Sequence, residues 1–154
     1  MDALLSASRV MVGLAARSVA DLGFDVTLPQ YRALVVLASR GPQRIVDISA
    51  ELGVTSSTGT RMCERLVRKG LIQRERSDVD RREVRLTLTD DGEYLVQEVT
   101  RRRRRELSRI VDTVPEVSYE PLTAALRSLA DTAGELPDSE WWLGWHEGDA
   151  ERHP

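Results

Sequence analysis

Apolar residues recur at helical spacing along most of the chain and alternate in only one short stretch. The helical spacing predicts helices over about 3–21, 28–40, 46–52, 55–69, 90–112 and 118–136. Alternation over 71–76 and 83–88, around the polar residues 77–82, predicts a β-hairpin with a charged tip. We therefore expect a mostly α-helical fold with one small two-stranded sheet.

Helix boundaries are marked by capping residues and glycines. Thr27-Leu28-Pro29-Gln30 has the pattern of a capping box with proline in the first turn. Gly23 and Gly70 each follow an apolar repeat and are expected to end a helix. Thr89 precedes two aspartates, which favours the start of a long helix there.

Two of the predicted helices, Val46–Leu52 and Thr55–Lys69, are joined at Gly53 and form a candidate helix-turn-helix. The second helix begins with small polar groups that suit the major groove: Ser56, Ser57, Thr58 and Thr60. One turn on, Arg61 could reach a guanine edge or a phosphate. Arg44 and Arg65 are candidates for phosphate contact. The alternative is that the hydroxyl cluster only caps the helix and Arg61 is only solvated.

The charged hairpin directly after this helix favours DNA binding over the simple capping interpretation. Such a hairpin is typical of a wing, and Arg81 or Arg82 at its tip could enter the adjacent minor groove. Asp80 beside them is either an ordinary turn residue or a partner that orients an arginine.

The ordered set of motifs resembles the MarR (multiple antibiotic resistance regulator) family over roughly residues 5–135. The resemblance lies in Leu28-Pro29-Gln30-Tyr31, in Asp47–Val54 (DISAELGV), in Arg65–Ile72 (RLVRKGLI), in Asp80-Arg81-Arg82 and in Leu88-Thr89 with Gly92 downstream.

The resemblance implies a winged helix-turn-helix homodimer that binds double-stranded DNA at a pseudo-palindrome. It implies dimerisation helices at 1–24 and 106–136, a winged helix-turn-helix with a long connecting helix over 28–105, and an acidic Trp-containing tail at 137–154. It further implies that Arg82 is the wing-tip arginine oriented by Asp80. A small-molecule effector between the dimerisation helices and the winged part would control DNA binding.

Gly59 departs from the family pattern, which usually has a small apolar residue at that place in the recognition helix. Glycine costs up to about 1 kcal/mol relative to alanine in a helix. It either allows closer approach to the helix behind it or softens the helix until DNA binds.

Charge is unevenly distributed. The net charge is −3, yet residues 40–105 hold 16 Lys and Arg against 11 Asp and Glu, whereas residues 106–154 hold 3 against 11. A basic centre can meet phosphate despite the acidic total. The single Cys63 cannot form an internal disulfide and is expected to be buried, and no continuous apolar run indicates a membrane span. We expect a cytoplasmic protein.

Two features remain without an assigned role. Arg101–Arg105 cannot share one helix face, and Arg103 is expected to point toward the apolar side. The three tryptophans, Trp141, Trp142 and Trp145, lie in the tail, where we expect them to dock on the fold or on a partner subunit.

The sequence therefore predicts a DNA-binding transcription regulator, more often a repressor in such proteins, with no catalytic residues, metal site or cofactor. The alternative is a ligand-sensing or protein-interaction module that keeps the fold without binding DNA.

Overall fold

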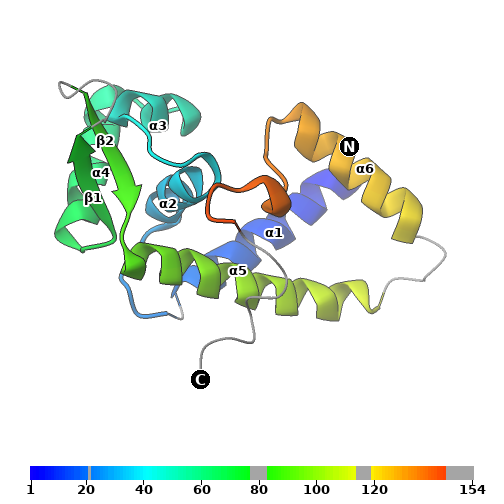
Figure 1. Ribbon diagram of the computed structural model, residues 1–154. Helices are drawn as coiled ribbons and strands as arrows, with labels where there is room; N and C mark the ends of the chain where they lie inside the picture. The colour runs from blue at the N-terminus through cyan, green and yellow to red at the C-terminus, as the bar shows by residue number, and fades with distance from the viewer. Residues whose placement is uncertain (21, 77–82, 114–118, 145–154) are drawn as a thin grey trace.

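The computed structural model describes residues 1–20, 22–76, 83–113 and 119–144 of the 154 residues. These described residues form six α-helices and one short two-stranded sheet (Figure 1). In order they are α1 (Asp2–Ala20), α2 (Leu28–Arg40), α3 (Ile45–Glu51), α4 (Ser56–Arg68), the strands β1 (Ile72–Arg76) and β2 (Val84–Leu88), α5 (Asp90–Val111) and α6 (Tyr119–Thr132), followed by a 3₁₀ turn, η2 (Asp138–Glu140).

Capping side chains begin three of the helices where the sequence predicts. The Thr27 hydroxyl accepts from the Gln30 amide while the Gln30 side chain accepts from the Thr27 amide, which completes the capping box of α2. Thr55 caps α4 and Thr89 caps α5 in the same manner, each through its hydroxyl. These bonds satisfy amides that would otherwise have no partner in the first turn.

The wing is an antiparallel hairpin in which Ile72 pairs with Leu88 and Arg76 with Val84. Gln43, in the loop before α3, adds an isolated bridge to Leu86, so the sheet is tied to the helix-turn-helix. Leu86 is buried, but Val84 near the tip is 48% exposed. Only the base of the hairpin therefore packs against the core.

The core is centred on α2, which lies in the middle of the molecule with α4 and the hairpin on one side and α1 and α5 on the other (Figure 1). Its apolar residues are almost all buried because every face of this helix has a neighbour. Core residues contributed by the other elements include Val19, Ile48, Cys63, Leu66, Leu71, Ile72, Leu86, Leu95, Val96 and Val99.

Only part of the apolar surface of helix α1 is buried within its own chain. Leu14, Ala15, Ser18 and Val19 are buried, whereas its first half is exposed. By length and mean hydropathy (1.3) this helix could cross a membrane, contrary to the expectation that no stretch would qualify. Its second half packs into the core, whereas the apolar residues of its first half stay exposed in one chain.

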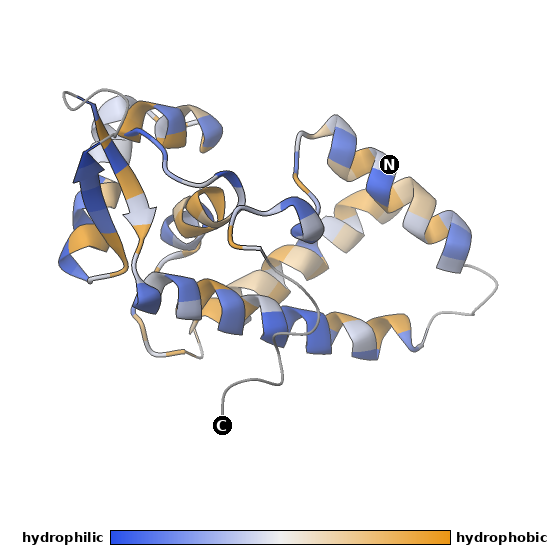
Figure 2. Cartoon of the chain, viewed as in Figure 1, coloured by the Kyte–Doolittle hydropathy of each residue, from blue (hydrophilic) through white to orange (hydrophobic). Residues whose placement is uncertain are grey.

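Helix α6 lies on the far side of the molecule from the wing and has no buried residue (Figures 1 and 2). It ends at Thr132, four residues before the predicted end, because Gly134 adopts a positive φ of 73°. Residues 133–144, here called the strap, then return to α2 and α5.

Candidate nucleic-acid interface

Helix α4 presents a polar surface at its N-terminal end and an apolar surface to the core. Gly59, Cys63 and Leu66 are buried, and Met62 and Val67 are half-buried against them. The predicted contact residues Ser56, Ser57, Thr58, Arg61 and Arg65 are exposed, and Thr60 is half-buried. The helix therefore displays together the groups that the sequence assigns to DNA.

Part of the hydroxyl cluster also has a structural role. The Thr55 hydroxyl donates to Thr58 Oγ1 over 3.0 Å and lies 3.2 Å from Ser57 Oγ, and Thr60 donates to the Ser56 carbonyl over 2.8 Å. Capping and exposure are therefore combined here, because Thr55 supplies the cap and leaves the residues of the first turn on the surface.

Gly59 lies where α4 crosses α3. A Cβ built on Gly59 would overlap Ser49 Oγ and lie 3.0 Å from Ser49 Cβ. Ser49 is buried and its hydroxyl donates to the Ile45 carbonyl over 2.7 Å, so moving this hydroxyl aside would cost that bond. Of the two interpretations of Gly59, the structure supports close approach of the helices.

Cys63 is confirmed as a buried residue, 1% exposed. Burial raises the pKa of its thiol, although Arg74 nearby opposes the rise. A protonated, buried thiol is a poor nucleophile, so Cys63 is a packing residue of the recognition helix.

Arg44 links the base of the wing to the start of α3. Its guanidinium donates to both carboxylate oxygens of Asp47 over 2.7 Å and lies 3.6 Å from a Glu83 carboxylate oxygen. The pair raises the pKa of Arg44 and lowers that of Asp47. Arg44 is thus exposed but paired, and a phosphate would have to compete with Asp47 for it.

Sequence analysis did not predict the Arg44–Asp47 ion pair, although opposite charges at i,i+3 at the start of a helix favour one. The predicted wing-tip residues Asp80, Arg81 and Arg82 lie outside the described residues.

Comparisons with known proteins agree with this arrangement. A profile of the MarR family matches residues 26–84. The crystal structure of RV1404 from Mycobacterium tuberculosis is 38% identical, covers 88% of this chain and 92% of its own, and superposes with a TM-score of 0.83. The HTH-type transcriptional regulator MgrA of Staphylococcus aureus is 34% identical over 95 residues, which are 62% of this chain and 59% of that protein. The chain belongs to the MarR family.

MarR proteins are transcription regulators and not enzymes. Among solved structures, Streptococcus pneumoniae FabT in complex with DNA is 27% identical to this chain, covers 86% of it and 94% of its own length, and has a TM-score of 0.70. The predicted fold class, a mostly helical winged helix-turn-helix with a small sheet, is confirmed by these likenesses.

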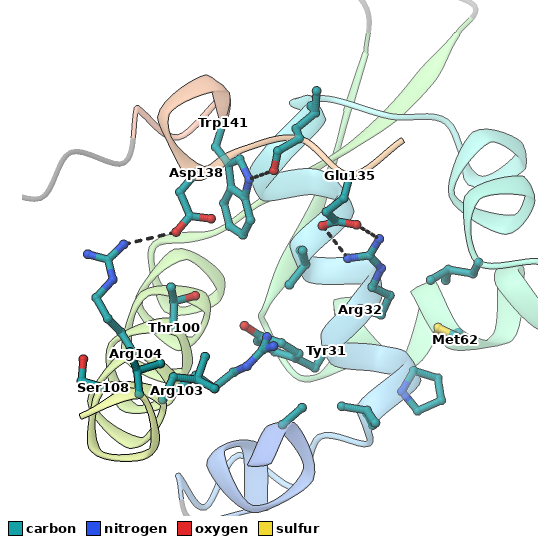
Figure 3. Close-up of a pocket in the computed structure, with 18 of the residues that line it drawn as sticks. Tyr31, Arg32, Met62, Thr100, Arg103, Arg104, Ser108, Glu135, Asp138 and Trp141 are labelled. Atoms are coloured by element: carbon teal, nitrogen blue, oxygen red, sulfur yellow. Dashed lines mark hydrogen bonds and ion pairs between the residues drawn. The ribbon is translucent and has the colours of Figure 1, made fainter. Parts of the chain in front are cut away.

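This MarR chain also has a cleft of about 1010 Å³ between the winged part, α1 and α5 (Figure 3). Its walls are mainly apolar, and its polar groups include Tyr31, Thr100, three arginines and three carboxylates. The phenol of Tyr31 is buried, and burial raises its pKa, although Thr100 and Arg103 beside it oppose the rise. Sequence analysis assigned none of these residues to a ligand site, because the walls come from distant segments.

The arginine run divides between two sites. Glu98 is only 8% exposed and pairs with Arg101 at 2.9 Å, with Arg102 at 3.0 Å and more distantly with Arg105. Arg103 and Arg104 instead line the cleft, so the expected inward direction of Arg103 is confirmed.

Proposed function

We propose that this MarR protein is a homodimeric, sequence-specific regulator of double-stranded DNA, acting as a repressor that a small molecule releases. The observation that carries the proposal is the exposed polar end of α4, where Ser56, Ser57, Thr58 and Arg61 form one surface free of apolar side chains. Small hydroxyls and an arginine at the start of a recognition helix suit base edges in the major groove.

Within this proposal Ser57, Thr58, Thr60 and Arg61 read bases, while Arg65 and Arg44 meet phosphates. Arg82, oriented by Asp80, enters the minor groove from the wing tip, and Arg81 contacts the backbone; these assignments rest on the sequence alone.

Dimerisation is supported by apolar side chains that one chain leaves uncovered at the end remote from the wing (Figure 2). They are Leu4, Leu5, Val10, Met11 and Val12 of α1, Ile110 and Val111 of α5, and Leu122, Leu126 and Leu129 of α6. Exposed large apolar side chains gathered at one end of a chain are typical of a protein interface. Two interlocked copies would place two α4 helices on the half-sites of a pseudo-palindrome about 34 Å apart.

Effector control is supported by the cleft between the winged part and α5. A ligand there can act only by binding more tightly to one spacing of the two recognition helices than to the other. The family membership fits a cytoplasmic regulator.

The direct test is fluorescence anisotropy with the DNA upstream of the protein's own gene. We expect binding whose affinity falls steeply as salt rises, since phosphate contacts release counterions. Binding that is absent at low salt, or insensitive to salt, would favour the alternative of a ligand-sensing module without DNA binding.

Arg61→Ala is expected to weaken binding to the specific site by about tenfold, since one good arginine–guanine contact is worth about 1–3 kcal/mol. The matched control is Arg17→Ala, which removes the same charge from the exposed face of α1. Anisotropy titrations of both variants at one salt concentration measure the effect. An equal loss for both would show that Arg61 contributes only charge.

A further inference from the structure

The strap, residues 133–144, caps the C-terminal end of α2 (Figure 1). The last four carbonyls of a helix have no partner within it, and the strap supplies two of the missing donors. The Trp142 amide donates to the Ser39 carbonyl over 3.0 Å, and the Leu143 amide donates to the Ala38 carbonyl over 3.1 Å. The ring of Trp142 covers Gly41, where a Cβ would lie 2.7 Å from it. The strap therefore helps to fix the path by which the chain leaves α2 for α3.

Two ion pairs and one buried ring hold the strap in place. Glu135 accepts from both arms of the Arg32 guanidinium of α2, at 2.9 and 2.5 Å. A two-pronged pair of this kind fixes orientation as well as distance. Asp138 accepts from Arg104 of α5 over 3.2 Å. Trp141 is 9% exposed and lies between the two pairs (Figure 3). The strap is thus attached to both α2 and α5.

The contacts of the strap extend to α3 and, through the next loop, to the wing. The same Nη2 atom of Arg40 donates to the Gly134 carbonyl of the strap over 3.2 Å and to Glu51 of α3 over 3.0 Å. Gln43, in the loop after α2, forms the bridge to Leu86 of β2. Since the strap begins directly after α6, it connects the end of α6 to the parts of the fold that carry the helix-turn-helix and the wing.

We propose that the strap determines which operator spacing the protein accepts. By tying the end of α6 to α2, it holds the winged part at one position relative to the proposed dimerisation helices. The two recognition helices of a dimer are thereby restricted to one separation. This inference rests on the homodimeric DNA binding proposed above and adds to it a specificity-determining element that does not touch DNA.

The strap acts through preorganisation. While it is docked, the second recognition helix has a high effective concentration at one half-site separation and a low one at the others. When the strap is loosened, the winged part samples several positions. The affinity for the preferred separation then falls, and the affinity for neighbouring separations rises. The ratio of the two affinities therefore reports the strap, whereas a general loss of stability would weaken binding to both duplexes alike.

The test compares two duplexes in fluorescence anisotropy titrations of the full-length protein. One is a pseudo-palindrome that the unaltered protein selects from a random pool, and the other has one base pair inserted at its centre. The insertion moves one half-site by about 3.4 Å and rotates it by about 35°. We expect the unaltered protein to prefer the selected duplex by at least about tenfold, because a rigid dimer cannot follow that change.

Glu135→Gln, Asp138→Asn removes both ion pairs and is expected to reduce the preference to about threefold. The three tryptophans of the sequence are at 141, 142 and 145, so acrylamide quenching of their fluorescence measures the loosening of the strap and should increase. Trp141→Ala, which removes the buried ring, should reduce the preference at least as far, with circular dichroism showing that the helices are retained.

Asp131→Asn, Glu140→Gln is the matched control, because it removes two exposed carboxylates and changes the charge equally. It should keep the preference and the quenching of the unaltered protein. An unchanged preference in the double variant Glu135→Gln, Asp138→Asn, an equal reduction in the control, or an unaltered protein that binds both duplexes equally would overturn the role of the strap and leave DNA binding standing. Failure to select any duplex would instead overturn the proposed function and, with it, the spacing role.

Discussion

Gly59→Ala is expected to lower the free energy of unfolding by about 2 kcal/mol, although alanine alone would favour the helix by about 1 kcal/mol. The added methyl group would overlap the buried Ser49 hydroxyl and press on Ser49 Cβ. Overfilling a packed interface typically costs about 1–3 kcal/mol, and here the hydroxyl must also give up its bond to the Ile45 carbonyl. Urea unfolding at a fixed protein concentration measures the change.

A double-mutant cycle with Ser49→Gly shows whether the contact is the cause. Ser49→Gly, Gly59→Ala moves the small residue from α4 to α3, so it should recover at least about 1 kcal/mol of the loss as a coupling energy. Glu64→Ala, at an exposed position of α4, is the control for a new alanine in the same helix. Additive effects, or a Gly59→Ala protein as stable as the parent, would instead support a glycine that softens the helix.

The sequence was most informative where a structure depends on neighbouring residues. The hydroxyls of Thr27, Thr55 and Thr89 mark helix starts because capping bonds reach only three residues along the chain. The hairpin was predictable for the same reason, since alternation in β2 and a polar tip are local signals. The exposed polar surface of α4 was likewise predictable, because the spacing of its apolar residues places them on the opposite, buried side.

Long-range packing could not be predicted from these local patterns. Arg32 and Glu135 are 103 positions apart, and nothing in their neighbourhoods distinguishes this carboxylate from the other acidic residues of the C-terminal part. The cleft is a joint property of α1, α2, α4, α5 and the strap, so no single segment contains its pattern. The tail was predicted to dock because of its tryptophans, but its place on α2 required the fold.

The Gly59 question shows the same limit at one residue. The sequence offered two physical explanations for a glycine within a helix, and they differ only in what lies opposite. Ser49 is ten residues away, on the preceding helix, and the crossing of α3 and α4 determines whether it meets Gly59.

A rigid junction connects the recognition helix to the long helix that leads toward the proposed dimer interface. The Thr89 hydroxyl donates to the Gly70 carbonyl over 2.5 Å, and the Thr89 amide donates to the Leu71 carbonyl over 3.2 Å. A side chain at Gly92 would collide with that same carbonyl. The end of α4 and the start of α5 are therefore held together, so a shift of α5 relative to its partner would move α4 as well.

Leu126→Glu, Leu129→Glu is expected to convert the protein to a monomer and to weaken binding to a pseudo-palindromic site by about 100-fold. Both leucines are about half exposed in one chain, 50% and 49%, and lie on one face of α6. Burying two carboxylates in an apolar interface is strongly unfavourable, so dimerisation should fail. The loss of affinity follows because two linked recognition helices bind with an effective concentration that separate monomers lack.

Ser128→Glu is the control, since it adds a carboxylate to the opposite face of the same helix and should leave both assembly and DNA affinity unchanged. Analytical ultracentrifugation measures the assembly state and fluorescence anisotropy the DNA affinity. A double variant that stays dimeric would place the interface elsewhere on the chain. A monomer with undiminished affinity would mean that one recognition helix and one wing are enough, and that the operator is a single half-site.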